Sequence, residues 1–129
     1  MARRERFGMR AAAARAAAVI RIDAVWLATA PVDMRAGADR LLAMVVQVFG
    51  AAQAHHGYVF GNARGTRLKL LVHDGFGVWC AARRLNEGRF QWPAPGSVAP
   101  MALSRQQFDA LVLGLPWRRL DQMQRITHV

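Results

Sequence analysis

Residues 66–73 alternate between apolar and polar side chains, and this alternation is the feature that most restricts the fold. The apolar side chains that would share one face of a strand are Leu68, Leu70 and Val72. The basic side chains of Arg67 and Lys69 would lie on the other face, because successive residues of a strand point to opposite sides. Turn sequences flank the segment at residues 62–65 and 73–75, and the second contains an Asp-Gly pair. The pattern predicts a strand between two antiparallel neighbours.

Other segments with strand-like or helix-like patterns surround this strand. Further strands are predicted at residues 23–29, 58–60, 78–84 and 89–92. A helix is predicted after Asp33, which is placed to cap it, and Gly50 ends this helix. A second helix is predicted to begin after Ser104 as its N-cap and to run through Leu113. This order predicts a single α+β domain, with an antiparallel β-meander of four to five strands and two helices packed on one face of the sheet.

Composition divides the chain into three parts. Residues 1–18 hold five arginines and many alanines, so they could form a basic arm that becomes ordered on nucleic acid. A frayed tail is a second interpretation, and translation from upstream of the true start, near Met9 or Val19, is a third. The second and third interpretations are favoured. Residues 19–119 carry the periodic segments and are expected to form one folded domain, with residues 120–129 as a tail.

The balance of charge favours an anionic partner. The chain of 129 residues has 18 basic and 8 acidic side chains, which gives a formal net charge of +10. Lys69 is the only lysine among the basic residues. Arginine keeps its charge in all surroundings and presents a planar fork that fits a phosphate group. Nucleic acid is therefore the expected class of partner.

Membrane insertion and export are both disfavoured by the sequence. The longest continuously apolar run, residues 41–46, is far shorter than the roughly 20 residues of a membrane-spanning helix. Arg15 interrupts the alanine tract that otherwise imitates a signal peptide. Cys80 is the only cysteine, which excludes a disulfide framework and a Cys-based zinc cluster, and its apolar neighbours indicate a core position. We expect a cytoplasmic protein with no membrane partner.

Few side chains could support catalysis. Two-metal catalysis at a phosphate group needs carboxylates that converge on two cations, and most of the eight acidic residues have other expected roles. Asp33 is interpreted as a helix cap and Asp74 as the turn residue of a hairpin. His73 is the best acid-base candidate but has no partner evident in the sequence, and the pair His55 and His56 lacks the spacing of a metal site. We predict no catalytic residue, no metal and no cofactor.

Three sequence blocks and a C-terminal segment resemble a known family. They are residues 25–35 with Gly37, residues 65–79, residues 83–93, and the segment of residues 103–119. In this order and spacing they resemble TnpB, the accessory protein from the second reading frame of the insertion-sequence family numbered sixty-six. The resemblance implies participation in transposition beside a separate transposase. It implies no defined molecular activity.

Basic residues of the predicted sheet form the candidate nucleic-acid-binding site. They are Arg64, Arg67, Lys69, Arg83 and Arg89. Because Arg83 and Arg84 point to opposite faces of one strand, only one of them can join the others. Trp79 or Trp92 could lie among these cations, and the combination suits phosphate contact and base stacking. The predicted partner is DNA, either at the element ends or at the target.

An adaptor that binds the transposase without contacting DNA is the alternative function. The candidate partner-binding residues are Trp117, Arg118 and Arg119. Trp117 follows a Gly-Leu-Pro sequence that would end the second helix, so we expect its indole to be exposed and able to anchor a partner. The transposase of the same element is the expected partner in this case.

Overall fold

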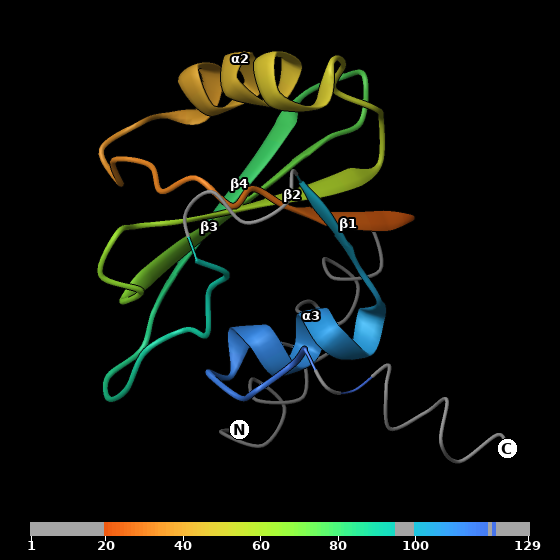
Figure 1. The fold of residues 1–129 in the computed structure, drawn as a ribbon. Helices are drawn as coiled ribbons and strands as arrows, with labels where there is room; N and C mark the ends of the chain where they lie inside the picture. Colours follow the sequence, from red (N-terminus) through yellow and green to blue (C-terminus); the bar gives the residue numbers. More distant parts are fainter. Residues whose placement is uncertain (1–19, 95–99, 119, 121–129) are drawn as a thin grey trace, which may run out of the picture.

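The computed structural model describes residues 20–94, 100–118 and 120, which form a five-stranded sheet and two helices (Figure 1). The strands are β1 (Ala24–Leu27), β2 (His56–Gly61), β3 (Arg67–His73), β4 (Val78–Arg84) and β5 (Met101–Leu103). The helices are α2 (Ala38–Phe49) and α3 (Arg105–Val112). The predicted α+β class is confirmed. The predicted basic arm and residues 121–129 of the predicted tail lie outside the described residues.

The strands lie in the order β4-β3-β2-β1-β5. β2, β3 and β4 form an antiparallel meander, as predicted. β1 lies outside this meander because it pairs parallel to β2, and α2 supplies the crossover that parallel neighbours require. β5 pairs antiparallel to β1 at the far edge.

Among the described residues, no helix is long and apolar enough to cross a membrane.

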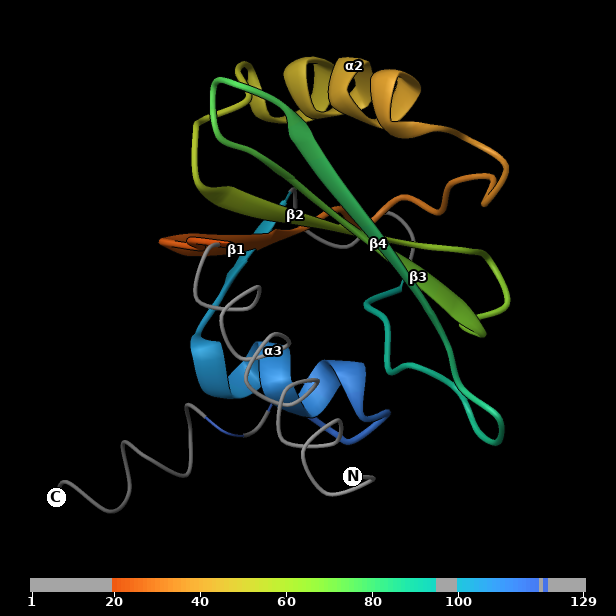
Figure 2. The ribbon, with the colours of Figure 1, turned by 180° about the vertical axis from the view of Figure 1, so that it is seen from behind.

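The two helices cover opposite faces of the sheet (Figures 1 and 2). The core beneath α2 includes Leu41, Val45, Tyr58, Phe60 and Leu71. The core beneath α3 is a separate cluster that includes Val25, Leu27, Val59, Leu68, Phe108 and Leu111. The prediction that both helices lie on one face is therefore wrong. Since β2 is apolar at three successive positions, Tyr58 to Phe60, it buries side chains on both faces, and each face needs a covering helix.

β4 is the exception to this burial, because all seven of its residues are exposed. Neither core cluster includes a residue of this strand. The prediction that Cys80 belongs to the core is wrong, because its strand forms the edge of the sheet and its thiol is exposed. Trp79 is 44% exposed on the same strand.

One predicted strand is absent and one observed strand was not predicted. Residues 89–92 do not form a strand but pass along the end of the sheet. Their hydrogen bonds go to loops, with Phe90 N–H donating to Gly65 O at 2.7 Å and Trp92 Nε1 donating to Ala28 O at 3.1 Å. β5 was missed because three residues are too few to show an alternating pattern.

The two helices begin in different ways. Asp33 does not cap α2, because a helix capped by Asp33 would start at residue 34, whereas α2 starts four residues later, at Ala38. Gly37 occupies the N-cap position and makes no side-chain hydrogen bond. Asp33 Oδ1 instead accepts a hydrogen bond from Arg35 N–H at 2.9 Å and closes a local turn. Ser104 caps α3 as predicted, and Gln107 completes a reciprocal capping box.

Ser104→Ala is expected to lower the free energy of unfolding by about 1 kcal/mol, because one N–H of the first turn of α3 loses its acceptor. Urea denaturation followed by circular dichroism measures this change. Thr29→Ala, which removes a hydroxyl with no hydrogen bond in the described part of the chain, is the matched control. Equal stability of the two variants would contradict a capping role for Ser104.

Candidate nucleic-acid interface

The turn between β2 and β3 places two arginines at one end of the sheet. Asn62 Oδ1 accepts hydrogen bonds from the N–H groups of Thr66 at 2.9 Å and Arg67 at 3.1 Å. Gly65 closes the turn with a φ of 69°, a left-handed conformation that glycine adopts without steric cost. Arg64 lies exposed in this turn, and Arg67 begins β3 immediately after it.

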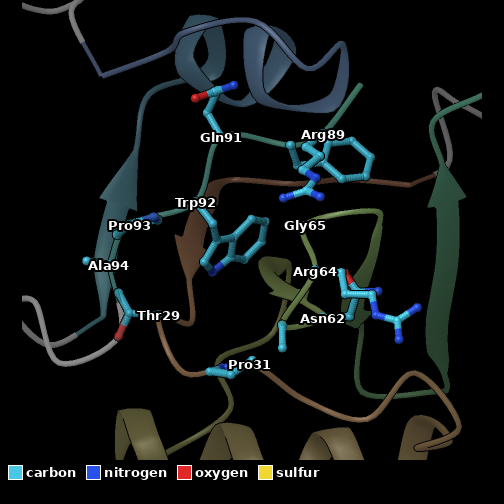
Figure 3. Close-up of a pocket in the computed structure, with 12 residues that line it drawn as sticks. Thr29, Pro31, Asn62, Arg64, Gly65, Arg89, Gln91, Trp92, Pro93 and Ala94 are labelled. Carbon is cyan, nitrogen blue, oxygen red and sulfur yellow. The ribbon is translucent and has the colours of Figure 1, made fainter. Parts of the chain in front are cut away.

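A hydrogen bond to the same turn brings a third arginine to this end. The backbone bond from Phe90 to Gly65 holds Arg89 beside the turn that carries Arg64. Arg64, Arg89 and Trp92 line a hollow of about 360 Å³. Figure 3 shows the Trp92 indole in this hollow, with Arg64 and Arg89 on the side of Gly65.

Arg67 and Arg84 are direct neighbours across the β3–β4 ladder, and both are exposed. They line a second hollow of about 410 Å³. A third hollow of about 370 Å³ shares Arg64 with the first and Arg67 with the second, so it adjoins both of them. We define the basic surface as the four arginines Arg64, Arg67, Arg84 and Arg89.

The acidic side chains of the described residues do not neutralise the positive charge of this basic surface. The ion pairs of the described residues each join close neighbours in sequence: Arg21–Asp23, Asp33–Arg35 and Arg105–Asp109. Within residues 20–94, 100–118 and 120, none of the four arginines of the basic surface forms an ion pair. Asp33 lines the third hollow, but hydrogen bonds from Arg35 lower its pKa to about 2, so its charge is already paired.

Comparison with known proteins identifies the family of this chain. The model of the family described as IS66 Orf2-like protein matches residues 23–122. The chain belongs to this family. The resemblance seen in the sequence is thereby confirmed, and the family supports an accessory role in transposition of IS66-type elements.

Two relatives from Sinorhizobium fredii (strain NBRC 101917 / NGR234) are similar to this chain. The uncharacterized protein y4hO is 35% identical over 106 residues, which cover 81% of this chain and 91% of the relative. The uncharacterized protein y4jC is 34% identical over 100 residues, which cover 76% of this chain and 84% of the relative. No solved structure matches the chain.

Two of the five predicted nucleic-acid-binding residues, Lys69 and Arg83, line the second hollow and also make hydrogen bonds within the fold. Lys69 is half-buried, and its Nζ donates a hydrogen bond to Ala36 O at 2.9 Å, which anchors the segment before α2. Arg83 faces α3, where its Nε donates to Val112 O at 2.7 Å. A cation at this position also complements the negative end of the helix dipole.

Arg84, which was not among the predicted binding residues, lies beside Arg67 in the second hollow. The two arginines do point to opposite faces, as predicted, and it is Arg84 that pairs with Arg67. The hairpin register could have identified it, since a turn over residues 74–77 makes residues 67 and 84 partners. Arg64, Arg67 and Arg89 are brought together as the sequence analysis expected.

Trp117 is buried, with only 1% of its surface exposed. Its Nε1 donates a hydrogen bond to Gln91 O at 2.6 Å, and its ring belongs to the core beneath α3. The predicted exposure is wrong, because the chain after α3 turns back onto the sheet instead of leaving it. Arg118 is exposed, with its guanidinium carbon 5.8 Å from the centroid of the Trp117 ring. Arg119 lies outside the described residues.

The side chains considered for catalysis make hydrogen bonds within the fold. His73 Nε2 lies 2.8 Å from Ala52 O. Asp74 Oδ1 accepts hydrogen bonds from the N–H groups of Phe76 and Gly77 in the hairpin turn, as expected of a turn residue, and these bonds lower the pKa of Asp74. His56 Nδ1 accepts a hydrogen bond from the Trp26 indole at 3.0 Å. In the part of the chain that the structure describes, no three His, Cys, Asp or Glu side chains gather into a possible metal site.

Proposed function

We propose that this protein supports IS66-type transposition by binding DNA through the basic surface, without catalysing a reaction itself. The observation that carries the proposal is the cross-strand pair of Arg67 and Arg84, which lie directly opposite each other without an ion-pair partner among the described residues. Like charges in this arrangement destabilise a sheet. DNA phosphates would supply the missing negative charge, and guanidinium groups bind them bidentately.

The arrangement of the basic surface suits a polyanion more than a small anion. Its four arginines spread over three adjoining hollows instead of converging on one point. Phosphate contacts of this kind position a protein on DNA without reading base sequence. Trp92 lies next to Arg64 and Arg89, where an unpaired base could stack on its half-buried ring.

Removing two cations of the basic surface is expected to weaken the salt dependence of DNA binding. For Arg67→Gln combined with Arg84→Gln, the slope of log affinity against log salt should fall by about 1.8, since each phosphate contact on duplex DNA contributes about 0.9. Fluorescence anisotropy with an element-end duplex and a random duplex of equal length measures the slope. The loss should be the same for both duplexes.

The matched control removes the same charge at the opposite edge of the sheet. Arg21→Gln combined with Arg105→Gln also deletes two arginines, and each is ion-paired to a nearby aspartate. We expect this control to keep the slope of the unaltered protein. Equal slopes for all three proteins would overturn the proposal. If the Arg67 and Arg84 variant instead lost only its binding to the transposase, the adaptor function would replace DNA binding.

A further inference from the structure

The edge of the sheet at β4 is seven residues long, is apolar over its first five residues, and pairs with no further strand in the described part of the chain. Among the described residues, β3 is the one strand that pairs with β4, and all seven residues of β4 are exposed. Natural proteins shield such edges with short strands, prolines or inward-pointing charges. β5 at the other edge is shielded in this way, because it has three residues. The first five residues of β4, from Val78 to Ala82, contain no charge and no proline.

The ladder between β3 and β4 determines which backbone groups of β4 face outward. Asp74 N–H donates to Gly77 O at 3.2 Å, so Asp74 and Gly77 form a hydrogen-bonded pair. This pair lies one position beyond the pair of His73 and Val78, which is therefore not hydrogen-bonded. Hydrogen-bonded and non-hydrogen-bonded pairs alternate along an antiparallel ladder. The residues whose N–H and C=O groups point away from β3 are therefore Val78, Cys80, Ala82 and Arg84. An added strand would bond to these groups.

We propose that a second copy of this chain occupies this edge, with β4 pairing antiparallel to β4 of the partner subunit about a two-fold axis at Ala81. In this register the outward-facing residues of one copy pair with those of the other, Val78 with Arg84 and Cys80 with Ala82. Every outward N–H and C=O group of the strand thereby gains a partner. The two sheets become one continuous sheet of both copies.

The side chains of β4 complement one another only in the antiparallel direction. Arg83 and Arg84 lie at the C-terminal end of the strand, and Trp79 lies near its N-terminal end. Parallel pairing would set the arginines of both copies side by side, and like charges directly opposite are destabilising. Antiparallel pairing about Ala81 sets Arg83 of each copy opposite Trp79 of the other, within reach of a cation–π contact.

The residue at the proposed axis is small enough for the closest approach in the ladder. Ala81 would face Ala81 of the partner subunit at a non-hydrogen-bonded position, where the Cα atoms are only about 4.5 Å apart. The axis stands perpendicular to the sheet, so both α2 helices lie on the same side. The basic surfaces of both copies then face the same way. The proposed dimer does not depend on the proposed function in DNA binding.

Charge substitutions at Ala81 test the axis. Light scattering coupled to gel filtration of the full chain should give a mass that rises with concentration from 14.3 kDa toward twice that value. Ala81→Lys and Ala81→Glu should each remain monomeric with an unchanged circular dichroism spectrum, because like charges would meet at the axis. An equimolar mixture of the two variants should dimerise again. Ala102→Lys on β5 is the control and should dimerise like the unaltered chain.

A cysteine at the axis tests the register. In a Cys80→Ser background, Ala81→Cys should form a disulfide dimer under mild oxidation, because its Cα separation falls within the roughly 4.4–6.8 Å of natural disulfides. Val78→Cys in the same background should not, since its counterpart would be Arg84. The proposal is overturned by a chain that stays monomeric at all concentrations, by dimers that survive Ala81→Lys, or by cross-linking at residue 78 and not at 81. A monomer whose β4 variants lose transposase binding would assign the edge to a transposase strand instead.

Discussion

Trp117→Ala is expected to lower the free energy of unfolding by about 3–5 kcal/mol, the largest loss from any substitution considered for this chain. The indole is 1% exposed and packs in the same core cluster as Phe90 and Leu111. Removing it leaves a cavity and also leaves the carbonyl of Gln91 without its 2.6 Å hydrogen bond. Urea denaturation followed by circular dichroism measures the change.

Two further variants keep this prediction testable if Trp117→Ala fails to fold. Trp117→Phe retains most of the packing but removes the indole N–H, so it should cost about 1–3 kcal/mol. Phe76→Ala, at the fully exposed tip of the β3–β4 hairpin, is the control and should change stability by no more than about 0.5 kcal/mol. If the two Trp117 variants unfolded at the same urea concentration as Phe76→Ala, the indole would not be part of the core.

Gly65→Val is expected to cost about 2–4 kcal/mol, because backbone strain and crowding act at the same position. Gly65 has a φ of 69°, which strains a β-branched residue, and a Cβ there would lie 3.2 Å from Phe90 O. That carbonyl belongs to the segment that holds Arg89 beside Arg64. The variant should therefore lose DNA affinity as well as stability.

Gly75→Val separates the two causes. Gly75 has a similar φ of 88°, but nothing lies within 4 Å of the position that a Cβ would take. Only the strain remains, so this variant should cost about 1–2 kcal/mol and leave DNA binding unchanged. Thermal and urea denaturation of both variants give the comparison. Equal losses at the two glycines would show that the contact with the Phe90 segment contributes nothing.

The sequence by itself determined the features that depend on neighbouring residues. The alternation of residues 66–73 correctly predicted β3, and the Asp-Gly pair correctly predicted the turn into β4. Ser104 marked the start of α3, and Gly50 marked the end of α2 in a left-handed conformation. These signals are readable because strand periodicity, turn geometry and helix caps each involve only a few consecutive residues. Co-linear blocks also identified the family.

Only the tertiary structure decided which surfaces are buried and which cations meet. Periodicity shows that a strand has two faces, but the elements that cover each face come from distant parts of the chain. The sequence pattern therefore predicts both helices on one face, Cys80 in the core and Trp117 at the surface, and all three predictions are wrong. For the same reason the pattern does not show that the register of β3 and β4 sets Arg84, and not Arg83, opposite Arg67. Burial and cross-strand register are properties of packing between elements, and no single segment encodes them.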